Sequence, residues 1–231
     1  MSGDRVLRPQ LAGGLTAGVA EAGRGPLAGP VVAAAVILDP GQPIAGLRDS
    51  KRLPPAIRAR LAGEIRARSL AWAIGWVDAG EIDVLNILEA SLLAMRRALL
   101  GLAIAPSHVC VDGNRCPGDR MLGFACGFEA VVRGDARISE ISAASILAKV
   151  SRDAWMVRVA GCYPDYGFER HKGYPTADHL SCLARHGPSR LHRQSFGPVR
   201  SWEPLTDPRM GATACDYRPR QEARSDVYRD T

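Results

Sequence analysis

Short apolar runs separated by Gly, Pro and Asp recur along the first two thirds of the chain. Their length and their content of Val, Ile and aromatic residues are typical of buried strands. The five expected strands are Leu15–Ala20, Val31–Leu38, Leu70–Val77, His108–Val111 and Phe124–Val132. The first two are so close in sequence that we expect adjacent strands joined by the Gly/Pro-rich stretch between them.

Three longer segments carry the 3.6-residue period of amphipathic helices. The first begins at Pro54-Pro55, because proline is favoured in a first helical turn, and it carries Ile57, Leu61 and Ile65 on its expected inner face. The second is expected to start at Asp83 as its N-cap. The third runs from Ser139 to about Val159. The expected inner faces of the second and third are Leu85, Leu88, Leu92, Met95 and Leu99, and Ile141, Ser145, Ala148 and Arg152.

This order of strands and helices predicts an α/β domain with a mixed β-sheet flanked by helices. We expect residues 1–13 to form an N-terminal extension, residues 14–200 the folded domain, and residues 201–231 a flexible polar tail. Hydrophobic residues make up 46% of the chain and charged residues 23%, which excludes a disordered or fibrous protein.

The charge and the cysteines narrow the class of protein. A net charge of +6 points mildly to a polyanionic partner. The six cysteines show no CxxC pair and no zinc-ligand spacing, and Cys110 and Cys126 lie in apolar runs typical of buried free thiols. There is no apolar segment typical of a signal peptide, and the longest apolar run falls far short of the roughly 20 residues that cross a bilayer. We therefore expect a soluble, cytoplasmic protein of a reducing compartment, with no membrane partner.

Three acidic residues follow expected strands: Glu21 after the first, Asp112 after the fourth and Asp135 after the fifth. Chemistry in open α/β sheets gathers at strand ends, so these carboxylates are expected to converge. Converging carboxylates repel one another unless a cation lies between them, and Mg²⁺ prefers oxygen ligands. The pattern favours a divalent-metal site for phosphodiester hydrolysis.

The loop Gly23-Arg24-Gly25 lies between the first two strands. It lacks the lysine and hydroxyl that close a P-loop, and Pro26, Pro30 and the following strand exclude a dinucleotide-binding turn. Two interpretations are open from spacing: a plain tight turn, or a backbone that approaches a ligand closely with Arg24 available to a phosphate.

Six segments are similar to bacterial ribonuclease HII, a type 2 ribonuclease H. In chain order they are GVAEAGRGPLAGPVVAAAVIL, DSKRL, VDGN, VRGDARISEISAASILAKVSRD, YPDYGFERHKGYPT and HGPSRLHRQSF, spread over about Gly18 to Val199. The resemblance implies an RNase H-like fold. It also implies an endoribonuclease that cuts the RNA strand of RNA–DNA hybrids, and 5′ of ribonucleotides embedded in duplex DNA. The implied products carry 3′-hydroxyl and 5′-phosphate ends, formed with two Mn²⁺ or Mg²⁺ ions by a monomeric enzyme.

The resemblance assigns catalytic and metal-binding roles to Glu21, Asp112 and Asp135, but the family's fourth acid, an Asp expected to face both ions, is replaced by Ala20. Three explanations are open: an engineered inactive variant, a natural homologue with weakened catalysis, or another acid, such as Asp49 or Glu140, that reaches the metals. We favour a variant with weak or absent activity. The rival functions are a junction-binding protein that does not cut and another nucleotidyl transferase of the same fold.

The resemblance also indicates substrate-binding residues. Gly23, Arg24 and Gly25 correspond to the turn that reads the ribose 2′-hydroxyl, a group that distinguishes RNA from DNA. Tyr174 corresponds to the tyrosine that packs on the sugar after the ribonucleotide. The candidates for phosphate contacts are Ser50, Lys51, Lys172, His192 and Arg193.

Overall fold

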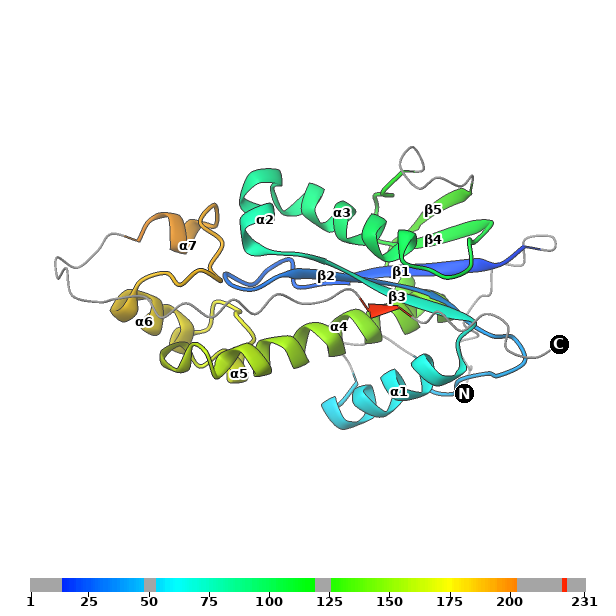
Figure 1. Ribbon diagram of the computed structural model, residues 1–231, viewed down its shortest axis with the longest axis horizontal. Helices are drawn as coiled ribbons and strands as arrows, with labels where there is room; N and C mark the ends of the chain where they lie inside the picture. Colours follow the sequence, from blue (N-terminus) through cyan, green and yellow to red (C-terminus); the bar gives the residue numbers. More distant parts are fainter. Residues whose placement is uncertain (1–13, 48–52, 119–125, 203–221, 224–231) are drawn as a thin grey trace.

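The computed structural model describes residues 14–47, 53–118, 126–202 and 222–223. One six-stranded mixed sheet forms its centre, in the order β5-β4-β1-β2-β3-β6 (Figure 1). The expected α/β class is confirmed. The strands are β1 (Thr16–Ala22), β2 (Val31–Ile37), β3 (Ala71–Val77), β4 (His108–Asp112), β5 (Gly127–Val131) and the two-residue β6 (Glu222–Ala223).

The direction of the strands changes beside β1. Strand β1 pairs antiparallel with β2 and parallel with β4, and β4 pairs parallel with β5. The carboxyl ends of β1, β4 and β5 therefore meet at one edge of the sheet, where the three acidic residues were expected. The antiparallel pair β1–β2 is joined by the Gly/Pro-rich loop, as its short length predicts.

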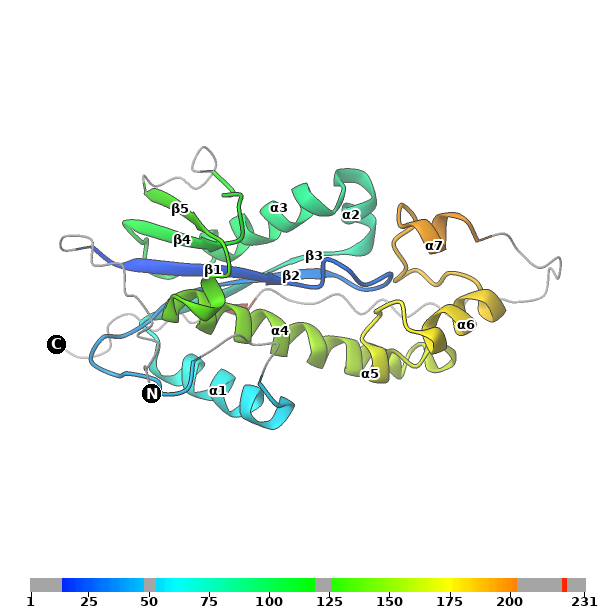
Figure 2. The same ribbon diagram turned by 180° about the vertical axis from the view of Figure 1, so that it is seen from behind.

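Helices cover both faces of the sheet. On one face, α4 (Ser139–Ala160) packs across the strands with α1 (Pro55–Arg68) beside it, and on the other lie α2 (Ala79–Leu85) and α3 (Ile87–Leu100) (Figures 1 and 2). The short helices gather at one end of the molecule. These are α5 (Phe168–His171), α6 (Ala177–His186) and α7 (Gly197–Arg200), with the 3-10 turns η2 (Gly134–Ala136) and η3 (Pro164–Tyr166) completing the chain order.

Several details of the helices differ from the sequence expectation. Ile57 is 41% exposed, so α1 buries only Leu61 and Ile65 of the expected stripe. Asp83 does not cap a helix: the expected second helix is split, because Asn86 has a φ of 69° that ends α2, and its side chain caps α3. The expected buried face of α4 is confirmed from Ile141 to Arg152.

Cysteine and membrane features complete the description. Cys110 is a buried free thiol, as expected, whereas Cys126 is only half-buried. Cys162, in contrast, is bonded in a disulfide, which the expectation of a reducing compartment did not include. Among the described residues, no helix has the length and apolar character needed to cross a membrane.

Candidate active site and recognition loop

Strand β1 places Ala20 and Glu21 on opposite faces of the sheet, because side chains alternate along a strand. Ala20 is fully buried and belongs to the core cluster on the α4 face. In the parallel β1–β4 ladder the last aligned pair is Val19 with Val111, so continuing the register by one residue puts Ala20 beside Asp112. Position 20 therefore adjoins an acidic residue at the strand ends.

The turn after β5 brings Asp135 to the same edge of the sheet. Arg133 adopts a left-handed conformation (φ 55°), and the Gly134 N–H then donates a hydrogen bond of 2.9 Å to Asp112 Oδ1. Gly134 packs so closely on Ile141 of α4 that a Cβ there would overlap the Ile141 side chain. The turn Arg133-Gly134-Asp135 therefore anchors Asp112 through the Gly134 N–H. Asp135, which follows Gly134 in the chain and is 8% exposed, is thereby held near the same strand end.

Glu21 is held at the border of the core with an unsatisfied oxygen. Its Oε1 lies 3.5 Å from Arg24 Nη1, whereas Oε2 is buried and accepts no hydrogen bond from any residue that the structure describes. Burial raises the pKa of the Glu21 carboxyl above its usual value. The guanidinium of Arg24 opposes this rise in the pKa, and the negative charge of Asp112 adds to it.

These features fit a divalent cation. Glu21 Oε2 is buried without a donor among the described residues, and the nearby charge of Asp112 raises the pKa of the Glu21 carboxyl. A positive charge between the two carboxylates would stabilise their ionised forms. The candidate ligands Glu21, Asp112 and Asp135 offer only oxygen, the donor that Mg²⁺ and Mn²⁺ prefer. These three residues would hold the ion, and Ala20 would contribute no ligand.

Another acid, Glu140 or Asp49, was one open explanation for the missing ligand at position 20. A Cβ at Gly18 would overlap the backbone of Glu140, so the start of α4 lies against β1 two residues before Ala20. The Glu140 carboxylate contributes to the raised pKa of the Cys110 thiol, which places it beside the middle of β4. Asp49 lies outside the described residues, as do Ser50 and Lys51.

A second group of metal-ligand type lies on the same strands but apart from the carboxylates. His108, Cys110 and Glu129 bring their ligand atoms within 4.8 Å of one another. Its imidazole and thiol belong to softer-metal chemistry, and burial raises the pKa of the Cys110 thiol to about 12. It is therefore distinct from the oxygen-only site at the strand ends.

The loop from Gly23 to Pro30 is fixed by two segments from the end of the domain. The Leu27 N–H donates to the Gly173 carbonyl at 2.8 Å, and the Gly29 N–H donates to the Leu191 carbonyl at 2.8 Å. Gly23 has a φ of 96°, a conformation that favours glycine. The loop is thus part of a three-segment layer and more than a tight turn between strands.

Two fully buried arginines complete this layer. Arg193 donates to the carbonyls of Gly23, Arg24 and Gly29 at 2.6–3.0 Å. Arg152 of α4 donates in the same way at 2.9–3.1 Å, to the carbonyls of Ala28, Pro30 and Lys172. Burial lowers the pKa of both guanidinium groups, to about 9 for Arg193 and about 10 for Arg152.

Tyr174 lies beside the glycine loop, as the resemblance implies. Its Cε1 lies 3.8 Å from the position that a Cβ would occupy at Gly25, and the residue is 39% exposed. The cations of Lys149 and Arg152 lie 5.7 and 5.8 Å from its ring centre. The exposed Arg24 side chain and the Tyr174 ring therefore border one surface next to Glu21.

The structure corrects the expected exposure of His192 and Arg193. His192 is 2% exposed and Arg193 is fully buried, so neither offers its side chain to a phosphate in this structure. Lys172 remains at the surface, where its ammonium bonds to the Glu169 carbonyl. The sequence reasoning missed Lys149 as a neighbour of Tyr174. The four-residue spacing of Lys149 and Asp153 predicts their ion pair of 2.8 Å, but the approach of Lys149 to Tyr174 depends on the tertiary fold.

Comparison with known proteins identifies this arrangement. The family model described as ribonuclease HII matches residues 17–199. The crystal structure of ribonuclease H2 from Pyrococcus horikoshii is 27% identical with a TM-score of 0.67, covering 80% of this chain and 95% of that chain.

Two more distant structures share the fold. RNase HII of Archaeoglobus fulgidus, in a complex with PCNA, is 24% identical with a TM-score of 0.60, over 79% of this chain and 95% of that chain. Bst-RNase HIII in complex with Mn²⁺ is 20% identical with a TM-score of 0.64, over 83% and 70%. The expected RNase H-like fold is confirmed, and the chain belongs to the ribonuclease HII family.

Proposed function

We propose that this protein recognises a ribonucleotide within a duplex through the Gly23–Gly25 loop and Tyr174, and that Ala20 limits the cleavage that follows. Family membership gives the reaction class, an endoribonuclease acting on RNA–DNA hybrids with a divalent metal. The observation that carries the finer proposal is the contact between the loop and Tyr174 next to the carboxylates: Arg24 bonds Glu21 on one side, and Gly25 adjoins Tyr174 on the other.

This geometry suits a reader of the 2′-hydroxyl. Because Gly25 has no side chain, the backbone can approach a sugar closely while Tyr174 packs against the next one. Arg24, about half exposed, can bind the adjacent phosphate. A scissile phosphate placed by these contacts would lie at the ends of β1 and β4, beside Glu21 and Asp112.

The acidic residues would hold the metal and set the charge around the phosphate. A bound divalent ion supplies water activation and stabilises the leaving oxygen. Glu21 would give its unpaired Oε2 to the ion, and the Gly134 N–H keeps Asp112 oriented. Ala20 has no side-chain oxygen to give, so we expect weak metal binding and slow cleavage by this chain.

The test uses a labelled DNA duplex with one embedded ribonucleotide, and the same duplex without it. We expect binding of the first to exceed binding of the second, with slow nicking in Mn²⁺ and none in chelator. An Asp112→Asn variant should bind like the parent and lose the residual nicking. Equal affinity for both duplexes would contradict the recognition part of the proposal.

Ala20 favours one second candidate, a protein that binds ribonucleotide junctions without cutting them. The chain has Ala20 in place of the expected acid, and it keeps the Gly23–Gly25 loop and Tyr174. Preferential binding with no nicking in Mn²⁺, Mg²⁺ or chelator would support this alternative. We further propose that the protein acts as a monomer.

A further inference from the structure

We infer that His192 and His179 are positioning residues, linked in a buried hydrogen-bond chain that sets the backbone of Tyr174 against the glycine loop. The inference rests on the proposed role of Tyr174 as a sugar-contacting residue. Both histidines are at most 2% exposed, so they cannot contact a nucleic acid themselves. What they contact is the segment that carries Tyr174.

The chain of hydrogen bonds has one consistent arrangement of protons. The Ser189 N–H donates to His192 Nδ1 at 2.9 Å, so the proton of neutral His192 must be on Nε2. His192 Nε2 lies 3.0 Å from His179 Nε2, which then accepts a hydrogen bond from the His192 Nε2–H. His179 Nδ1–H in turn donates to the Tyr174 carbonyl at 2.9 Å. The chain therefore runs from the Ser189 turn to the recognition loop.

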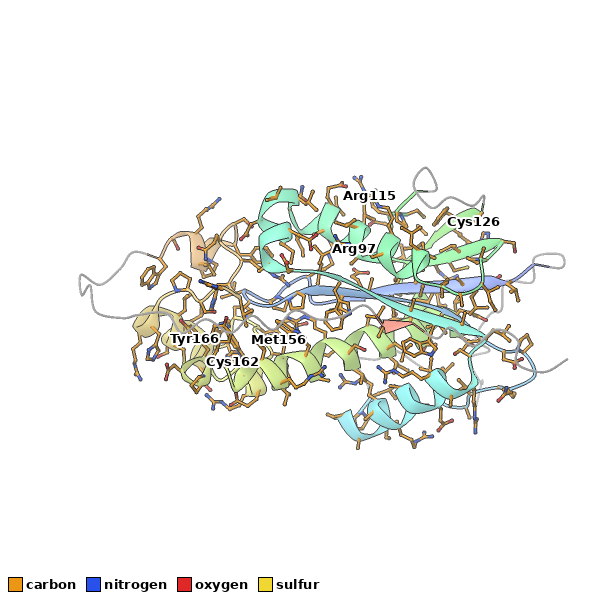
Figure 3. All side chains as sticks on the ribbon, viewed as in Figure 1. Arg97, Arg115, Cys126, Met156, Cys162 and Tyr166 are labelled. Carbon is orange, nitrogen blue, oxygen red and sulfur yellow. The ribbon has the colours of Figure 1, made fainter. Side chains whose placement is uncertain are left out.

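A third histidine and an aromatic cluster keep the rings in place. His171 stacks on His179 with ring centres 4.3 Å apart, and His171 Nε2 donates to the Tyr166 carbonyl at 2.7 Å. Tyr166 and Phe168 stack on each other with centres 5.3 Å apart, and both rings contact His192. Figure 3 labels Tyr166 at the end of the molecule where the short helices gather.

The polypeptide segment that carries His192 also holds the glycine loop directly. Residues on both sides of His192 bond the Gly23–Pro30 segment: Leu191 accepts from Gly29, and the Arg193 N–H donates to Leu27. Ala28 and His192 form a bridge of two antiparallel backbones. A shift of the His192 ring would thus change the spacing between the glycine loop and Tyr174, which is the spacing that a ribose would sense.

The experiment measures, in chelator, the ratio of the affinities for the one-ribonucleotide duplex and for the all-DNA duplex. The unaltered chain is the reference. We expect His192→Phe, which keeps a ring but cannot bond, and His179→Gln to reduce this ratio about 3- to 10-fold, the effect of one or two lost hydrogen bonds. The matched control is His108→Gln, a histidine at the start of β4 that belongs neither to the hydrogen-bond chain nor to the aromatic cluster, and it should leave the ratio unchanged.

A double-mutant cycle separates positioning from a general structural role. In a Tyr174→Ala background the His192→Phe substitution should have no further effect on the ratio, because the residue that it positions is gone. A full additional loss in that background would overturn the inference. If the parent shows no preference for the ribonucleotide, the proposed function itself fails. A preference that Tyr174→Ala abolishes and His192→Phe leaves intact refutes only the inference.

Imidazole nitrogen NMR of the unaltered protein provides a second measurement that does not depend on variants folding. We expect His192 and His171 as Nε2–H tautomers and His179 as the Nδ1–H tautomer at neutral pH. An Nδ1–H tautomer for His192, or a charged ring for either residue of the pair, would overturn the hydrogen-bond chain.

Discussion

Replacing Ala20 by Asp should restore the acid missing from the carboxylate cluster. Ala20 is paired with Ala34 on β2 and is aligned next to Asp112 on β4, so small side chains leave room on the β2 side. Only the carboxylate beyond the existing Cβ has to be accommodated. The substitution therefore tests charge and ligation at this position with little change in the shape of the sheet.

The loss of stability that Ala20→Asp should cause without metal follows from the spacing of the strands. Neighbouring parallel strands lie about 4.8 Å apart, and at this distance two unit charges repel by about 3 kcal/mol at an effective dielectric constant of about 20. We therefore expect Ala20→Asp to lower the melting temperature in chelator by up to about 6–12 °C for a domain of this size. Mn²⁺ should reverse most of this loss, because the ion binds the folded state.

The expected effect on catalysis is larger and has the opposite sign. In Mn²⁺, Ala20→Asp should raise the rate of hybrid cleavage at least a hundredfold, equal to about 2.7 kcal/mol of transition-state stabilisation. Single-turnover cleavage of a labelled RNA–DNA hybrid measures the rate. Ala20→Asn, of the same shape but uncharged, is the matched control and should gain much less. If the parent already cuts as fast as Ala20→Asp, the role given to position 20 is wrong.

Substitutions at three further positions test the recognition loop, its bracing and the buried carboxylate. Tyr174→Ala should reduce the preference for a ribonucleotide-containing duplex by about 5- to 100-fold in a binding titration, whereas Tyr174→Phe should retain most of it. Arg193→Met leaves three loop carbonyls without their donor and should cost about 3 kcal/mol or more in urea unfolding, and an unchanged stability would refute the bracing role. Burial raises the pKa of Glu21 in the folded protein, so folding favours the protonated carboxyl. The stability that the protonated carboxyl contributes is therefore lost as the pH rises through the folded pKa. Glu21→Gln should therefore stabilise the metal-free protein at pH 8 and not at pH 4, and equal melting shifts at both pH values would contradict the buried charge.

The strands and the long helix α4 could be predicted from the sequence because burial on each face leaves a periodic record. The β1–β2 pair and the buried face from Ile141 to Arg152 are examples. The split between α2 and α3 could not be predicted. The apolar stripe continues across Asn86, whereas the helical backbone is interrupted there. The exposed Ile57 has the same cause: a period shows which residues could be buried and cannot show where the neighbouring element ends.

Some features of the candidate site could also be predicted from the sequence, and others could not. The positions of Glu21 and Asp112 at the carboxyl ends of β1 and β4 could be predicted, because a strand end is a local feature of the sequence. The buried positions of Arg152 and Arg193 depend on a loop whose carbonyls need donors, and that loop is far away in the chain. A charged side chain in a polar segment suggests exposure, and only the fold reveals that its partners are backbone oxygens. For this reason the sequence predicts phosphate contacts for His192 and Arg193, whose side chains the structure buries.

The most direct test of the central claim is to map the cut made by Ala20→Asp protein in a duplex with one embedded ribonucleotide. The account predicts a single nick in Mn²⁺ on the 5′ side of the ribonucleotide, leaving 3′-hydroxyl and 5′-phosphate ends, and its loss in the additional Asp112→Asn variant. Cleavage scattered along the DNA, or at the same position without a divalent metal, would contradict it.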